Sequence, residues 1–275
     1  MKVKEVALPG TNNSMTNSGL SHVDGRLKVT GKAKYSAEYN VKGLVYGVMV
    51  GSTVTKGTVK SIDTKKAENA PGVLSVLTYF NAPKIPGYQV DNPPPKGPLK
   101  IFYNNQVYFN GQPIALVIAD TFERALFAST LVTATYDIDA HQTNLLTNLD
   151  KSFSTHREDK DFAKGQADIW QSAPVKVSAE YTIPTEVHNP MELHAIIARW
   201  DGDNKVSVYT KTQGVKSSQR SIAQAFKLPP ENVQVTAPFV GGAFGAALRT
   251  WPHEIAAVLA SKAVGKPVKL VLSRA

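Results

Sequence analysis

The chain has 275 residues and no cysteine, and its 31 Lys and Arg against 22 Asp and Glu give a formal net charge of +9. This length is enough for a sizeable core, and 42% hydrophobic residues with 19% charged residues are typical of a folded globular protein, not of a disordered one. The absence of cysteine excludes disulfides, thiolate-bound zinc or iron–sulfur centres and a cysteine nucleophile in this chain.

The basic charge does not indicate a nucleic-acid partner, and the hydropathy does not indicate a membrane span. The lysines are scattered and form no stripe with aromatic residues, so we expect no nucleic-acid partner. No stretch approaches the roughly 18 apolar residues of a membrane span, and residues 1–19 lack the apolar centre of a secretory signal. We therefore expect no membrane span and a cytoplasmic or periplasmic location.

The first half of the chain predicts an N-terminal arm at 1–22 and an α+β domain at 23–139. The arm is polar, and within the domain residues 85–99 are too rich in proline to be anything but an irregular loop. Short apolar runs predict strands at 44–50, 58–63, 73–80, 114–119 and 132–137. The strand at 58–63 either pairs with the one at 44–50 or leads into a helix. Helices are predicted at 64–69 and 122–131, the second opening on a capping box from Asp120 to Glu123.

The second half predicts a linker at 140–173 and a second domain at 174–275. Polar and charged residues dominate the linker. Strands are predicted at 175–183, 195–200, 205–210, 232–240 and 268–272. Helices are predicted at 217–226 and 252–264, with Gly265 capping the second. Because the chain stops on an apolar strand, we expect it to be a fragment or one half of a split protein.

The clearest chemical feature is the glycine-rich turn Gly241-Gly242-Ala243-Phe244-Gly245 between a predicted strand and a helix. Backbone N–H groups at such a turn and helix N-terminus bind anions. One hypothesis is a dinucleotide site with Arg274 as a phosphate ligand, although the G-x-G-x-x-G fingerprint is absent. The alternative is a tight packing turn without a ligand.

Gln213 ends the strand that precedes the predicted helix at 217–226. Because the ends of parallel strands meet at one edge of a sheet, we expect Gln213 and the glycine-rich turn to face the same crevice. A glutamine amide there can donate to an oxo group or to a pterin-like ring. The alternative is a helix-capping glutamine.

The histidines and their acidic neighbours favour structural roles. His188 and His194 are six residues apart with a proline between them, which is no zinc-binding spacing, so we expect no metal there. We expect Glu192 to be hydrogen-bonded across a β-bend. Glu254, at the start of a helix, is expected to cap it.

Several ordered motifs resemble the molybdenum-binding subunit of the xanthine dehydrogenase/aldehyde oxidase family. They are DGRLKVTGKAKY (24–35), PGVL (71–74), GQPIALVIADTFERA (111–125), HNPMELHAIIARWDGD (188–203), KTQGVKSSQRSIAQAFKLPPENVQV (211–235) and APFVGGAFG (237–245). The resemblance is greatest to bacterial aldehyde oxidoreductases and isoquinoline-oxidoreductase-like members. It implies an α/β hammerhead domain followed by the first part of a molybdopterin-binding domain.

The resemblance also implies a function, namely oxidation of aldehydes or aromatic heterocycles with water-derived oxygen at a pterin-bound molybdenum. The pterin is either the simple form or the cytosine dinucleotide form. Gln213 and the Gly241–Gly245 turn would bind this cofactor, whereas [2Fe-2S] clusters and FAD would sit on partner subunits. The general base would lie beyond residue 275, in the C-terminal remainder of the subunit. The resemblance therefore assigns no catalytic residue and no protein ligand of the metal to this chain, and we expect the isolated chain to be inactive.

The chain departs from the family pattern at the turn itself. The family sequence GGGFGGK reads GGAFGAAL here, and each alanine fits only where its φ is negative. Leu248 stands where purine-oxidising members carry a glutamate, which favours aldehydes or apolar aromatics as substrates. These departures leave an alternative, a non-catalytic interaction module that docks on a redox partner.

Overall fold

The computed structural model describes residues 22–88, 99–153, 164–166 and 168–274. The predicted arm at 1–22 therefore lies almost wholly outside the described residues, as does most of the predicted proline-rich loop at 85–99. Helices and sheets are mixed along the chain, so the predicted α+β class is confirmed. No helix within the described ranges is long and apolar enough to cross a membrane.

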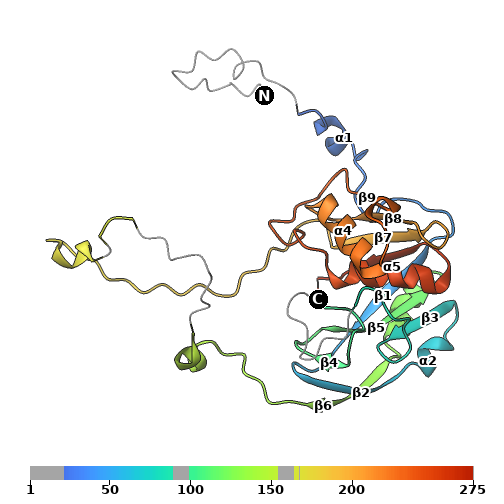
Figure 1. The fold of residues 1–275 in the computed structure, drawn as a ribbon, viewed down its shortest axis with the longest axis horizontal. Helices are drawn as coiled ribbons and strands as arrows, with labels where there is room; N and C mark the ends of the chain where they lie inside the picture. Colours follow the sequence, from blue (N-terminus) through green and yellow to red (C-terminus); the bar gives the residue numbers. More distant parts are fainter. Residues whose placement is uncertain (1–21, 89–98, 154–163, 167, 275) are drawn as a thin grey trace, which may run out of the picture.

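A seven-stranded sheet runs through the body of the molecule (Figure 1). Its strands, in spatial order, are β3 (Val73–Thr78), β5 (Pro113–Ala119), β1 (Val45–Gly51), β10 (Val268–Val271), β7 (Ala195–Trp200), β8 (Val206–Thr210) and β9 (Val233–Thr236). The join between the two halves is the parallel pair β1 and β10, with Val45 opposite Val268. The last strand of the chain thus lies in the middle of the sheet. The limits of the two predicted domains stay a prediction, but both contribute strands to one sheet.

A second, three-stranded sheet is built from the first half alone. It contains β4 (Gln106–Val107), β2 (Gly57–Asp63) and β6 (Thr133–Ile138), with β2 in the middle. Of the two alternatives for this strand, pairing with the strand at 44–50 is wrong, because β2 pairs with β4 and β6. It leads into helix α2 (Lys65–Glu68), as the second alternative predicted.

Helices cover both faces of the larger sheet, and the strand β5 shows why. Its apolar run is unbroken, so residues on alternate sides are all buried. Leu116 and Ile118 belong to the main core with helices α4 (Val215–Phe226) and α5 (Pro252–Val264). Ala115 and Val117 belong to a second core with α2 and α3 (Phe122–Ser129).

The helix boundaries confirm some capping predictions and correct one. Helix α5 has the predicted bounds, and Gly265 ends it with a φ of 63°. Helix α3 begins at Phe122 as predicted but ends at Ser129, before the predicted end, and its N-cap is Thr121 and not Asp120. The side chain of Thr121 accepts from the backbone N–H of Arg124, whereas Asp120 forms an ion pair with Arg124. The short helix α1 (Gly25–Val29) lies at the start of the predicted first domain.

Two predicted strands differ from the structure. Residues 175–183 form no strand, although they are extended and exposed. The predicted strand at 232–240 is shortened to β9, preceded by the 3₁₀ turn η3 (Pro230–Asn232), because Pro238 cannot donate to a ladder. Among the described residues of the connection between β6 and β7, the regular structure consists of two further short 3₁₀ helices, η1 (Leu146–Lys151) and η2 (Ile169–Ser172). Figure 1 shows this connection, in yellow and yellow-green, running away from the two sheets.

Candidate functional site

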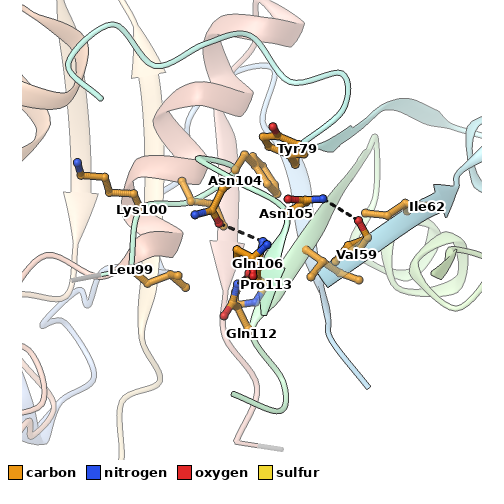
Figure 2. Close-up of a pocket in the computed structure, with 13 residues that line it drawn as sticks. Val59, Ile62, Tyr79, Leu99, Lys100, Asn104, Asn105, Gln106, Gln112 and Pro113 are labelled. Atoms are coloured by element: carbon orange, nitrogen blue, oxygen red, sulfur yellow. Dashed lines mark hydrogen bonds between the residues drawn. The ribbon is translucent and has the colours of Figure 1, made fainter. Parts of the chain in front are cut away.

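The enclosed pocket in the first half of the chain is too small for a substrate. It lies between the two sheets, and its volume of about 20 Å³ holds roughly one water molecule. Figure 2 shows that side-chain amides surround it, with Asn105 donating to the carbonyl of Val59. A substrate site must therefore lie elsewhere.

The topology brings Gln213 and the glycine-rich turn together, as predicted. Strands β8 and β9 are parallel neighbours, so the segments that follow them leave the sheet at the same edge. The backbone N–H of Gln213 donates to the carbonyl of Ala247 at 2.9 Å, which fixes the two segments side by side. The Gln213 side chain is exposed, and its amide has no hydrogen-bond partner among the described residues.

The turn presents a row of unpaired backbone donors. In the described part of the chain, the N–H groups of Gly242, Ala243, Phe244 and Gly245 donate to no acceptor. The φ angles are positive at Gly242 (87°), Phe244 (53°) and Gly245 (99°), and Ala243 lies between them without a positive φ. Successive N–H groups in such alternating conformations converge into an anion-binding concavity. The turn therefore has the geometry of an oxyanion or phosphate cradle.

The turn does not open the following helix, which corrects one part of the prediction. Helix α5 starts at Pro252, after an irregular segment, and its first residue has no N–H to offer. The Glu254 carboxylate accepts from the backbone N–H of Trp251 at 3.0 Å, so the predicted cap is confirmed. The helix N-terminus is thus satisfied internally, and any anion at the turn is held by loop N–H groups instead.

Glu192 holds the start of the turn in place, so it is hydrogen-bonded as predicted, but to Gly241 and Ser36, far away in sequence, and not across a β-bend. Its Oε2 accepts from the N–H of Gly241 at 2.7 Å, and its own N–H donates to the Gly241 carbonyl at 3.0 Å. Its Oε1 accepts from the hydroxyl of Ser36 at 2.7 Å. A Cβ on Gly241 would lie 2.6 Å from that of Glu192, so only glycine fits there. Ser36 is 156 residues away from Glu192, and no sequence pattern predicts this hydrogen bond.

Two cations fix the loop that carries Glu192. The Lys211 ammonium, at the end of β8, donates to the Glu192 carbonyl at 2.5 Å, and burial lowers the pKa of Lys211. The Arg274 guanidinium donates to the Asn189 side chain and, at 2.9 Å, to the Met191 carbonyl. Arg274 thus binds this loop, whereas the dinucleotide hypothesis required it as a phosphate ligand.

The rings of His194 and His253 pack against Trp251. The ring of His194 stacks on that of Trp251 with centroids 4.7 Å apart, and His253 lies edge-on to His194 at 6.0 Å. The Trp251 indole donates to the Ala246 carbonyl at 2.6 Å, which ties this cluster to the turn. No three His, Cys, Asp or Glu within the described ranges lie close enough to hold a metal ion.

Behind this cluster, burial shifts the pKa of two ionisable groups in opposite directions. Desolvation lowers the pKa of His253 to about 3, and the neighbouring His194 lowers it further. Desolvation raises the pKa of Glu254 to about 7, against hydrogen bonds from Trp251, Thr210 and Ser218 that lower it. Burial also lowers the pKa of His194. At neutral pH His253 is therefore uncharged.

The three alanines meet the condition set by the sequence, and Leu248 lies beside the turn. Ala243 and Ala247 are buried, and none of the three alanines has a positive φ. Leu248 is 59% exposed and lines an open hollow of about 390 Å³ together with Gly245 and Trp251. Phe244 is 74% exposed, and its φ is positive at 53°. An apolar rim therefore borders the cradle.

Comparison with protein families matches the two halves of the chain separately. A model described as the aldehyde oxidase and xanthine dehydrogenase a/b hammerhead domain matches residues 30–139. A model described as the molybdopterin cofactor-binding domain matches residues 150–275. The second match includes Gln213 and the whole turn.

Individual relatives are longer than this chain. The aldehyde oxidoreductase molybdenum-binding subunit PaoC of Escherichia coli (strain K12) is 36% identical over 255 residues, covering 92% of this chain and 34% of PaoC. The putative xanthine dehydrogenase molybdenum-binding subunit XdhA of the same strain is 28% identical over 269 residues, covering 92% of this chain and 35% of XdhA. The chain thus spans about a third of the length of these curated relatives.

Solved structures share the fold. Quinoline 2-oxidoreductase from Pseudomonas putida 86 superimposes with a TM-score of 0.75 at 22% identity, covering 93% of this chain and 34% of that one. Aldehyde oxidoreductase from Desulfovibrio gigas superimposes with a TM-score of 0.70 at 26% identity, covering 91% and 29%.

Proposed function

Because this chain belongs to the xanthine dehydrogenase/aldehyde oxidase family of molybdenum-binding subunits, whose members are oxidoreductases, we propose that it forms part of a molybdopterin site. The reaction we propose is oxidation of an aldehyde or an aromatic N-heterocycle with oxygen derived from water. The observation that carries the proposal is the row of unpaired N–H groups from Gly242 to Gly245 beside the exposed amide of Gln213.

The donor set fits the cofactor. Molybdenum oxo groups and the pterin phosphate are oxygen acceptors, and the cradle offers backbone N–H groups and one side-chain amide. The cradle is also open, because a Cβ on Gly245 would meet only the His188 ring at 3.7 Å and the Leu248 side chain at 4.0 Å. When bound, the molybdenum centre supplies the two-electron oxidation chemistry.

The proposed role of this chain's own residues is to bind the cofactor and to orient it. The Gln213 amide would donate to an oxygen of the cofactor, and the N–H groups of Phe244 and Gly245 would bind further cofactor oxygens. Glu192, Lys211 and Trp251 hold the loops still, so the donors are fixed before the cofactor arrives.

Leu248 sets the proposed substrate class. It lines the hollow beside the turn, where an apolar side chain gives no partner for the polar edge of a purine. A buried polar edge without a partner costs about 1–3 kcal/mol. We therefore propose an aldehyde or an apolar aromatic ring as substrate.

The general base is proposed to come from outside these residues. Glu192 is the acidic side chain bonded to the turn, and both of its oxygens already accept hydrogen bonds that hold protein backbone and Ser36. The electron-transfer centres, [2Fe-2S] and FAD, are likewise proposed on partner subunits, because this chain has no cysteine to hold a cluster. We propose the cytosine dinucleotide form of the pterin as the first form to test.

A hybrid subunit tests the proposal. In it, this chain replaces the 255 matched residues of PaoC, and molybdenum and pterin are counted per subunit after expression with the partner subunits of PaoC. We expect both to be present. Gln213→Ala should lower the rate of aldehyde oxidation roughly 100-fold, as removal of one preorganised donor does. Gln234→Ala, an exposed glutamine on β9, is the matched control and should leave the rate unchanged. A folded hybrid without pterin would instead support a non-catalytic interaction module.

A further inference from the structure

Residues 174–183 have the sequence of a strand but no strand beside them. Apolar side chains stand at every second position, and Lys, Ser, Glu and Thr stand between them. This strict alternation is typical of a half-buried strand. The apolar positions are Val175, Val177, Ala179, Tyr181 and Ile183.

In the described part of the chain, this segment is exposed and its backbone is unpaired. The four large side chains, Val175, Val177, Tyr181 and Ile183, are 80% to 90% exposed. Within the described ranges, no backbone N–H or carbonyl of residues 174–187 takes part in a hydrogen bond. An apolar face and a full row of free donors and acceptors therefore coincide on one stretch of chain, which is the condition for pairing with another strand.

The rest of the connection has the same character. Further large apolar side chains between β6 and the end of η2 are more than half exposed, namely Leu145, Leu146, Leu149, Phe153, Ile169 and Trp170. Monomeric proteins rarely expose so much apolar surface in one region. The connection between β6 and β7 thus has the apolar composition of a segment that packs against other polypeptide.

The comparisons indicate what covers it. The molybdopterin cofactor-binding domain model matches residues 150–275, so it includes residues 174–183 as part of a domain, not as a linker outside one. The related subunits are about three times as long as this chain. The segment is therefore part of the matched domain. The additional chain of the longer relatives provides polypeptide that can pair with it.

We propose that residues 174–183 form a β-strand in the assembled subunit, paired with an extended segment of the molybdenum-binding subunit that lies outside these 275 residues. The odd-numbered side chains pack against that partner domain, and the even-numbered side chains face solvent. The inference rests on the proposed function in taking the chain as part of such a subunit, but not on the identity of the cofactor or substrate.

Hydrogen exchange followed by mass spectrometry tests this in two samples, the 275-residue chain alone and the hybrid subunit defined above. We expect rapid exchange in the chain alone and, in the hybrid, exchange of the 175–183 amides slowed by at least about 100-fold. Protection in a monomer of the chain alone would overturn the proposal, because the segment would then pair with its own open edge at β9 or β3. Protection in a dimer would overturn it in favour of a second copy.

Paired substitutions keep the test decisive. Val177→Lys with Tyr181→Lys places charge on the apolar face, and Ser178→Lys with Thr182→Lys places the same charge on the polar face. The first pair should abolish protection in the hybrid, and the second pair should leave it. If the hybrid does not accumulate, the same pairs of substitutions are made at the aligned positions of PaoC, and assembly of the PaoC subunits is measured instead. Equal effects of the two pairs would contradict the proposal.

Pterin content separates this proposal from the proposed function. Protection of residues 175–183 without bound pterin rejects only the function, and bound pterin without protection rejects only the strand.

Discussion

The Glu192 carboxylate accepts a hydrogen bond from the backbone N–H of Gly241 at 2.7 Å, and the two residues also pair through their main chains. This contact joins the loop before β7 to the first residue of the glycine-rich turn. The second carboxylate oxygen reaches Ser36, so one side chain connects three segments that are far apart in sequence. The cradle is therefore held from its first residue.

Removal of this carboxylate should loosen the turn. Glu192→Ala leaves the Gly241 N–H and the Ser36 hydroxyl unpaired, and we expect the free energy of unfolding to fall by about 2 kcal/mol, as for lost hydrogen bonds to a charged group. Urea denaturation measures this loss, and hydrogen exchange at Gly241 should become faster. Glu231→Ala, which removes an exposed carboxylate from η3, is the control. Equal effects of the two variants would show that Glu192 does not fix the turn.

The indole of Trp251 should support the other end of the turn. Trp251→Phe keeps a ring against His194 but loses the hydrogen bond to the Ala246 carbonyl. We expect a loss of about 1 kcal/mol in unfolding free energy, with faster exchange in residues 242–248. Trp200→Phe is matched, because its indole donates to the Val258 carbonyl in the core at 2.9 Å. That variant should lose similar stability without affecting the turn.

Buried Glu254 should make stability fall as the pH rises. Its pKa is about 7 in the folded chain against an ordinary 4.5, so its contribution to stability is complete below pH 4.5 and is lost as the pH rises through 7. His253 acts in the opposite direction, since its lowered pKa gives a contribution that is complete above pH 6.5 and is lost as the pH falls towards 3. In the wild type the two effects partly cancel between pH 4.5 and 6.5.

Glu254→Gln separates the two effects. The variant keeps an acceptor for the Trp251 N–H and removes the ionisation, so the change in unfolding free energy from pH 5 to pH 8 should be more positive than in the wild type. The largest expected change is about 3 kcal/mol, from roughly 1.4 kcal/mol per pKa unit. Urea denaturation at the two pH values measures it. An unchanged pH dependence would contradict the buried, proton-binding state of Glu254.

Much of the fold follows from local patterns. The apolar run at β5 predicts a strand covered on both faces, and helix α5 with its cap at Gly265 follows from helical spacing and one glycine. The extended segment at 175–183 shows the limit of such patterns. Alternating apolar and polar side chains show which face of a strand would be buried. A strand forms only beside a second strand, and the described residues provide none for this segment.

The candidate site was partly predictable for the same reason. Gln213 and the turn follow parallel strands, so their proximity could be inferred from topology, and the structure confirms it. Ser36, Lys211 and Trp251 act through contacts between segments that no spacing relates. The helix N-terminus was assigned to the turn by sequence proximity, yet Glu254 and Pro252 occupy it.

The most direct test of the central claim compares two glycine substitutions in the hybrid subunit. Gly245→Ala and Gly265→Ala each place a methyl group on a residue with positive φ, 99° and 63°; the new Cβ would make only ordinary van der Waals contacts at Gly245 and none within 4 Å at Gly265. Both should cost about 1 kcal/mol of stability. Only Gly245 lies in the proposed cradle, so only Gly245→Ala should lower the molybdenum and pterin content per folded subunit, by about tenfold for a loss of 1.4 kcal/mol in binding. Equal cofactor content in the two variants would contradict the turn as the cofactor site.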